Sequence, residues 1–136
     1  MRVKILILGL VCLLFFSCGT PLSRLTQLYP QESDFLFSKM VQTLQELEWT
    51  IENMDRPTLF ISAKKLTKGE ALSAALSGEM APHSASINFI KKNGDIELSI
   101  QVSQPGKIMK YSKVCERLAN EIKEKFEENI GKQQIR

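Results

Sequence analysis

Residues 86–102 constrain the fold most, because turn chemistry and side-chain alternation agree on one structure. Apolar and polar residues alternate on both sides of Asn93-Gly94. An Asn-Gly pair suits a type I′ turn, which needs positive φ at both central positions. With this pair as a two-residue loop, the apolar side chains of both strands share one face. The opposed pairs predicted in this register are Phe89 with Leu98 and Ile87 with Ile100. The segment is therefore expected to form a hairpin with one buried face and one polar face.

Two amphipathic helices are predicted at the ends of the domain. Ser33 is a good N-cap for the first, a helix of about 14 residues with Asp34 in its first turn. The second runs from Ile108 to Asn129 and ends at Gly131. Apolar residues in both recur at spacings of three and four, which indicates one buried stripe on each. The stripes are Phe37, Met40, Val41, Leu44 and Leu47 in the first, and Tyr111, Val114, Cys115, Leu118, Ile122 and Phe126 in the second.

A second hairpin is expected just after the first helix. Residues from Trp49 to about Asn53 alternate in polarity, as do those from Thr58 to Lys64. Asp55-Arg56-Pro57 between them is typical of a turn.

The segment Lys65–Ser84 connects the two hairpins, and its role stays open at this point. Ala71, Leu72, Ala75 and Leu76 fit a short amphipathic helix that Gly78 would stop. One interpretation is a short helix packed at a sheet edge. The other is a flap over a ligand or a partner-binding segment, because long connections in compact domains are often functional.

The predicted order is helix, two strands, connecting segment, two strands, helix. This gives an α+β fold: a two-layer sandwich in which two helices flank a four-stranded, mainly antiparallel sheet. We expect one domain over residues 32–131 and a frayed tail over 132–136.

The N-terminus has the composition of an export signal. Arg2 and Lys4 precede the apolar run Ile5–Phe16, which Ser17 and Cys18 follow. This order is that of a secretory signal peptide. The run has 12 residues, whereas a helix needs about 20 to span a bilayer core.

The sequence Phe15-Phe16-Ser17-Cys18 resembles the signal of bacterial lipoproteins, with two bulky residues where the commonest pattern has Leu and a small residue. The resemblance implies that residues 1–17 are removed and that Cys18 carries a diacylglyceryl thioether. Two or more acyl chains anchor a protein stably. Gly19 follows the cysteine rather than Asp, which in such families favours the outer membrane, facing the periplasm, over the inner membrane.

Two alternatives for the N-terminus remain open: an uncleaved short anchor, and ordinary secretion. Ordinary cleavage before Cys18 suits Ser17 but not the bulky Phe15 three residues upstream. Residues 18–31 are expected to form the lipidated N-terminus and a flexible tether, because Pro21 and Pro30 disfavour a long helix. About 13 extended residues would reach roughly 45 Å.

Charge and cysteine content limit the partners. Without Arg2 and Lys4, the chain keeps 16 basic against 15 acidic side chains. This balance argues against nucleic acid. With Cys12 removed and Cys18 lipidated, Cys115 is the remaining cysteine of the three, so no intramolecular disulfide is expected. Its place in the helical stripe indicates a core residue rather than a reactive or bridging thiol.

Little in the sequence predicts catalysis. His83 is the single histidine, and we expect it in a Pro-containing loop, where no sequence feature points to a catalytic constellation. The chain has no metal-ligand spacing and no phosphate-binding glycine loop. Trp49 is expected in the core, with a pocket wall as the alternative. We therefore predict no enzyme, no cofactor and no metal site.

A second resemblance concerns the mature domain. The sequence Leu47-Glu48-Trp49-Thr50-Ile51, followed by Asp55 and Ile61-Ser62-Ala63, resembles the opening of the repeated domains in the lipoprotein subunit of the β-barrel assembly machinery. Those domains are helix-grip-like α+β folds. The likeness covers about 30 residues, and a shared fold does not imply shared partners.

The function predicted from these observations is that of a lipid-anchored envelope protein without enzymatic activity, which binds another envelope protein as an assembly or structural accessory. The alternative is a carrier that holds a small apolar ligand between sheet and helices, under the Ala71–Leu76 segment.

Replacement of Cys18 tests the lipoprotein signal. Cys18→Ser removes the sulfur that would accept the lipid, so the precursor should accumulate unprocessed. Labelling of cells with a radioactive fatty acid and comparison of the chain's mass in the two strains measure this. Processing and membrane retention equal to those of the unaltered chain would show that the lipoprotein assignment is wrong.

Overall fold

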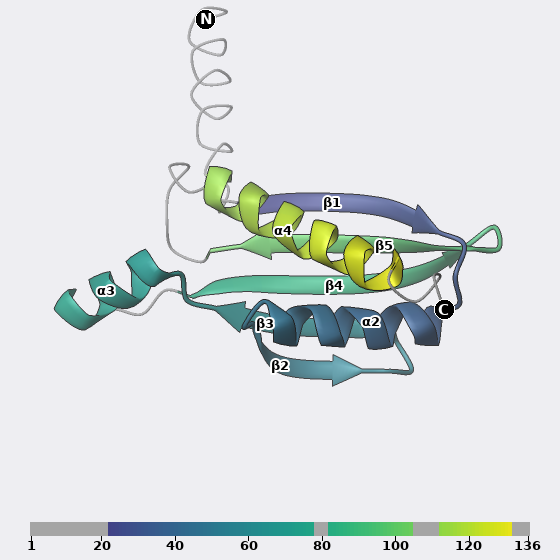
Figure 1. Cartoon of the computed structure of the whole chain (residues 1–136), viewed down its shortest axis with the longest axis horizontal. Helices are drawn as coiled ribbons and strands as arrows, with labels where there is room; N and C mark the ends of the chain where they lie inside the picture. Colours follow the sequence, from purple (N-terminus) through teal and green to yellow (C-terminus); the bar gives the residue numbers. More distant parts are fainter. Residues whose placement is uncertain (1–21, 78–81, 105–111, 132–136) are drawn as a thin grey trace, which may run out of the picture.

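A five-stranded antiparallel sheet forms one layer of the structure, a computed structural model that describes residues 22–77, 82–104 and 112–131 (Figure 1). The strands lie in the order β1-β5-β4-β3-β2. In chain order the elements are β1 (Leu22–Tyr29), α2 (Ser33–Glu46), β2 (Thr50–Asp55), β3 (Phe60–Lys65), α3 (Lys68–Ser77), β4 (His83–Lys92), β5 (Asp95–Ser103) and α4 (Ser112–Gly131).

The hairpin predicted around Asn93-Gly94 is confirmed in its turn and its register. Ile87 pairs with Ile100, and Lys92 and Asp95 close the ladder beside the two-residue loop. The pair Phe89 with Leu98 is also as predicted. The φ angles of Asn93 and Gly94 are 53° and 92°, the positive values that a type I′ turn needs.

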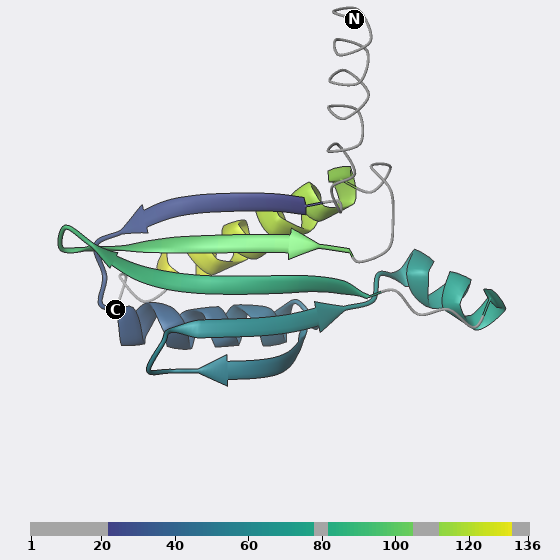
Figure 2. The ribbon, with the colours of Figure 1, turned by 180° about the vertical axis from the view of Figure 1, so that it is seen from behind.

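Helices α2 and α4 cover one face of the sheet, and none of the helices formed by the described residues lies on the other face (Figures 1 and 2). Alternate strand residues point to opposite faces, so the apolar rows of β3, β4 and β5 all lie beneath the helices. The most completely buried members of this inner layer are Ile61, Ile87, Leu98, Ile100 and Val102 from the sheet, with Leu36, Phe37, Met40, Leu44, Ile122 and Phe126 from the helices. The predicted two-layer α+β architecture is thus observed.

The structure corrects the predicted four-stranded sheet, and it corrects the flexible tether predicted over residues 18–31 in the part that it describes, residues 22–31. Residues Leu22–Tyr29 form a fifth strand, which pairs antiparallel with β5 along its whole length. The leucines of this segment recur every three residues, which gives no two-residue period. Leu25 pairs with Ile100 on the inner face, whereas Leu28 pairs with Glu97 on the outer face. The strand forms because the edge of β5 offers backbone partners.

Tyr29 joins β1 to α4. Its hydroxyl donates a hydrogen bond of 3.0 Å to Oε1 of Glu127, and its ring packs edge-on against Phe126 with centroids 5.4 Å apart. Burial, together with the bond to Glu127, raises the pKa of the Tyr29 phenol well above its usual range. These contacts fix β1 to the rest of the domain, so the segment is not a flexible tether.

A polar bridge joins α2 to α4 beside the apolar core. The amide nitrogen of Asn129 donates to Oγ1 of Thr43 at 3.0 Å and to Oε2 of Glu46 at 3.1 Å. Hydrogen bonds from Gln42 and Asn129 lower the pKa of the Glu46 carboxyl. The ammonium of Lys125 lies 3.5 Å from the same carboxylate. The bridge fixes the two helices in one register, because buried amide and hydroxyl groups need partners.

The predicted element boundaries shift slightly. Ser33 is the first residue of α2, and the N-cap is Glu32, whose side chain makes no capping hydrogen bond. The second hairpin forms as β2 and β3, with an irregularity between Ile51 and Asn53. Helix α4 begins at Ser112, so the predicted start at residue 108 lies outside the described residues, as do the tail 132–136 and the signal and lipid-attachment residues 1–18.

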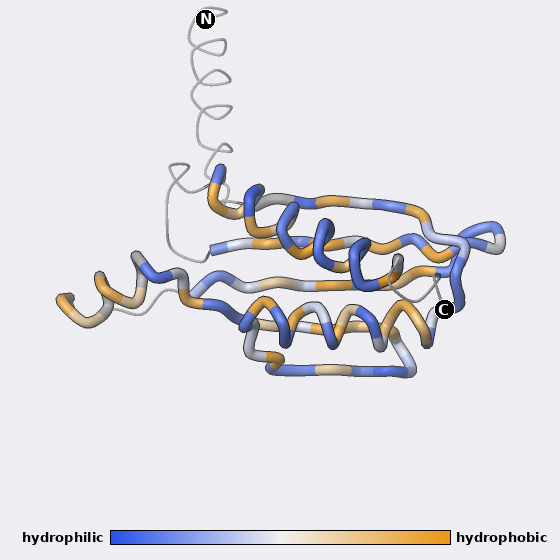
Figure 3. Tube along the Cα trace, viewed as in Figure 1, coloured by the Kyte–Doolittle hydropathy of each residue, from blue (hydrophilic) through white to orange (hydrophobic). Residues whose placement is uncertain are grey.

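The connecting segment contains the predicted short helix, α3, but the helix is not packed at a sheet edge. Figure 3 shows α3 with apolar turns and projecting beyond the end of the sheet. Leu72 is 66% and Leu76 is 82% exposed. The interpretation as a packed edge helix is therefore wrong.

Gly94 tests the turn that sets the register. A Cβ at this position meets no atom within 4 Å, so Gly94→Ala adds no clash. The backbone φ of +92° is strained for alanine, which should lower the free energy of unfolding by about 1 kcal/mol in urea denaturation.

Gly131→Ala is the matched control. A methyl group at Gly131 would also meet open space, but the φ of this residue lies outside the left-handed region. Its replacement should leave stability unchanged or raise it slightly, since alanine is the better helix former. Equal effects of the two substitutions would contradict the assigned turn.

Candidate interaction face

The outer face is the surface of the sheet that faces away from α2 and α4 (Figure 2). The ladder registers place its side chains in rows across the strands. Its members include Arg24, Thr26 and Leu28 of β1, Glu97, Ser99, Gln101 and Ser103 of β5, Ser84, Ser86, Asn88 and Ile90 of β4, Phe60, Ser62 and Lys64 of β3, and Thr50, Asn53 and Asp55 of β2.

The centre of the outer face is polar but uncharged. Ser62, Ser86 and Gln101 form one row, and Asn88 and Ser99 lie in the next. All five are partly exposed. Hydroxyl and amide groups both donate and accept hydrogen bonds, so a partner surface can be matched without burial of a charge.

Charged groups stand at the margins of the outer face and are mostly engaged. Lys64 lies 2.7 Å from Glu52, and Lys92 lies 2.8 Å from Glu97. Arg24 donates to the side-chain oxygen of Gln101 at 2.6 Å. Exposed pairs of this kind contribute little to stability. Because opposite charges are paired in this way, the outer face has no strong positive or negative electrostatic potential.

The residues that the sequence marked for possible chemistry are buried in separate parts of the core. His83 is fully buried at the first position of β4, which corrects its expected place in a loop. It joins the inner face because Ala85, Ile87 and Phe89 continue the same alternation. Cys115 is fully buried on α4, as predicted. Trp49 is buried before β2, as predicted for a core residue, with the ammonium of Lys65 6.0 Å from its ring.

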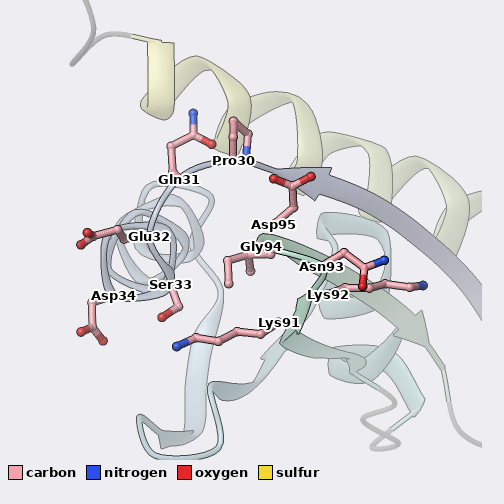
Figure 4. Close-up of a pocket in the computed structure, with 11 residues that line it drawn as sticks. Pro30, Gln31, Glu32, Ser33, Asp34, Lys91, Lys92, Asn93, Gly94 and Asp95 are labelled. Carbon is pink, nitrogen blue, oxygen red and sulfur yellow. The ribbon is translucent and has the colours of Figure 1, made fainter.

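A pocket of about 530 Å³ lies between the N-terminus of α2 and the β4–β5 turn (Figure 4). Its lining is Pro30–Asp34 and Lys91–Ile96. The lining of this pocket carries both signs of charge: Glu32, Asp34 and Asp95 are acidic, and Lys91 and Lys92 are basic. The pocket therefore favours neither an anionic nor a cationic ligand. The lining contains neither histidine nor cysteine, and it offers no catalytic constellation.

A wider groove of about 920 Å³ runs between the start of α3 and the exposed side of α4. Its lining mixes both signs of charge, with Lys65, Lys68, Lys113 and Arg117 against Glu48, Glu116, Glu121 and Glu124. Such mixed, solvated charge is typical of a helix surface rather than of a site.

The described residues lack two further kinds of feature. No group of three or more His, Cys, Asp or Glu side chains within them is placed to hold a metal ion. None of the helices they form has the length and apolar character needed to cross a bilayer.

No protein-family model matches the chain. No curated protein matches it significantly. Among solved structures, it is similar to the crystal structure of TTHA0849 from Thermus thermophilus, with a TM-score of 0.41 and 6% sequence identity over 81% of this chain and 97% of that one. A likeness at this level says nothing about what the chain binds.

The sequence indicated a polar sheet face but not its extent. The alternation of Glu97, Ser99 and Gln101 is visible in the sequence and predicts the polar side of β5. The contribution of β1 was missed because its only clear inward residues, Leu25 and Tyr29, stand four apart, a spacing that strand and helix share.

The burial of Cys115 and the lipidation of Cys18 can be tested together by thiol titration of the mature chain. A disulfide-exchange reagent should not react in native buffer, because Cys115 is fully buried. In guanidinium chloride one thiol per chain should react if Cys18 is a thioether. Two reactive thiols in guanidinium chloride would contradict lipidation. If only one thiol reacts there, its rapid reaction already in native buffer would contradict the placement of Cys115.

Proposed function

We propose that this chain is a bacterial envelope lipoprotein, held at a membrane by lipid on Cys18, whose domain binds another envelope protein as a non-enzymatic assembly or structural accessory. The outer membrane, facing the periplasm, is the proposed location, as Gly19 after the cysteine implies. The observation that supports the binding role is the outer face, a broad sheet surface that no helix of the described residues covers.

The dimensions of the outer face suit a protein partner. Five strands span four gaps of about 4.8 Å, and nine residues of β5 extend for about 30 Å. The resulting area is on the order of 600 Å², near the roughly 800 Å² that each partner contributes to a standard interface. An open sheet surface of this size, with a polar centre and the exposed apolar side chains of Leu28 and Ile90, is better matched to another protein than to a small molecule, which favours a concave site.

The resemblance of residues 47–63 to domains of the β-barrel assembly machinery supports a protein-binding module in the same compartment. In this chain, α2 is followed by Trp49 and then by the β2–β3 hairpin. We propose the kind of domain on this basis, and not the identity of the partner.

No observation favours the alternative of an apolar-ligand carrier. Within the described residues, aromatic rings fill the space between sheet and helices, with Phe89 6.1 Å from Phe37 and 6.4 Å from Phe126 between ring centroids. The segment expected to cover such a ligand is α3, which projects away from the sheet (Figure 1).

The proposal is tested by substitutions on the outer face combined with cross-linking in cells. Ser62→Arg with Ser86→Arg places two long cations at adjacent positions of one row, which should lower recovery of a cross-linked partner from detergent-solubilised membranes about tenfold. Glu116→Arg with Glu121→Arg, on the exposed side of α4, is the matched control.

Equal recovery from the outer-face variant and the unaltered chain would contradict the assignment of the outer face. Recovery of the monomer alone from cells with the unaltered chain would contradict the binding function itself. Retained circular dichroism of both variants, measured beforehand, ensures that a loss of partner is not a loss of fold.

A further inference from the structure

Helix α3 presents an apolar stripe that the rest of the described domain does not cover. Ala71, Leu72, Ala75 and Leu76 lie at helical spacings of three and four, and all four are exposed. Lys68, one turn before them, is exposed as well. Two leucines held in solvent next to each other have an unfavourable hydration cost, which points to a surface that covers them.

The position of α3 relative to the lipid-attachment site follows from the sheet register. Leu22, Ser103, Ser84 and Lys64 form one row across β1, β5, β4 and β3. Helix α3 leaves the sheet at Lys65, so it starts from the same end at which β1 begins (Figure 1). Three strand spacings, or about 14 Å, separate Leu22 from Lys64 along that row.

The length of chain before β1 limits how far this end can lie from the membrane. Cys18 precedes Leu22 by four residues, which span at most about 14 Å when fully extended. A lipid on Cys18 therefore keeps Leu22 within that distance of the acyl chains' attachment point, and the strand end from which α3 leaves within about 28 Å of it. A helix of 10 residues is about 15 Å long, so α3 can reach the same bilayer surface.

We propose that α3 docks on the lipid bilayer through Leu72 and Leu76, as a second membrane contact beside the lipid on Cys18. This inference rests on the proposed lipid anchor and adds an orientation to it. A helix this short would bind a bilayer only weakly by itself. The lipid anchor compensates for this weak affinity. It already holds α3 beside the bilayer, so the effective concentration of the membrane surface around the helix is high.

The orientation has a consequence for the outer face. With the α3 end at the membrane, the strands run away from it, and the Asn93-Gly94 turn stands on the order of 30 Å from the surface. The outer face then stands upright on the bilayer instead of lying against it. A partner in the aqueous compartment could reach the whole face while the domain stays fixed.

Photo-cross-linking of the complete lipidated chain in vesicles of phosphatidylethanolamine and phosphatidylglycerol tests this proposal. A diazirine amino acid replaces Leu76 in one variant and Ile90 in the other. Ile90 is the matched control, because it is a 54% exposed apolar residue near the opposite end of the sheet. Lipid adducts measured by mass spectrometry should be about tenfold more abundant at position 76.

A second variant reports docking without a probe. Leu72→Asp with Leu76→Asp should leave the anchor intact but expose Lys68 to trypsin in vesicles, whereas the unaltered chain is protected there. Equal lipid adducts at positions 76 and 90, adducts with a second copy of the chain, or unchanged cleavage at Lys68 would overturn the docking. The mass of the mature chain, measured first, separates these outcomes from failure of the lipid anchor itself.

Discussion

The structure depends on the burial of the apolar side chains on one face of the paired strands β4 and β5, with the neighbours Ile87 and Ile100 at their centre. Full burial of one such side chain contributes roughly 1.5–3 kcal/mol to the free energy of folding, and it requires other apolar groups that exclude water from this face. Helices α2 and α4 supply these groups on one side. Successive strand residues point to opposite faces, so the mostly polar residues between the buried ones lie on the other side of the sheet. The same alternation thus produces both the core and the candidate interaction face.

The two helices are aligned by polar contacts that the apolar core alone would not specify. Asn129 joins Thr43 and Glu46 across the helix pair, and Tyr29 ties the edge strand to α4 through Glu127. Apolar packing tolerates small slides between helices, whereas hydrogen bonds at fixed distances do not. These contacts convert β1 from a tether into part of a rigid domain.

That conversion changes how a lipid on Cys18 would hold the protein. A tether of about 13 residues would let the domain turn freely at up to roughly 45 Å from its anchor. With lipid on Cys18, the four residues from Cys18 to the start of β1 would instead hold one end of the sheet near the membrane. The short connection to Cys18, the exposed α3 and the outer face would then together make the proposed module, which is anchored at one end and accessible along its sheet.

The sequence alone was sufficient to predict those elements in which turn residues and the period of apolar side chains indicate the same structure. The β4–β5 hairpin followed from Asn93-Gly94 and its flanking alternation, and the burial of Cys115 and Trp49 followed from helical and strand periods. The remaining features required tertiary contacts, because β1 has no period of its own and exists through the free edge of β5. The burial of His83 likewise depends on the register that extends β4 back to it. The exposure of α3 depends on whether a packing surface lies beside the helix, and local sequence carries no information about distant surfaces.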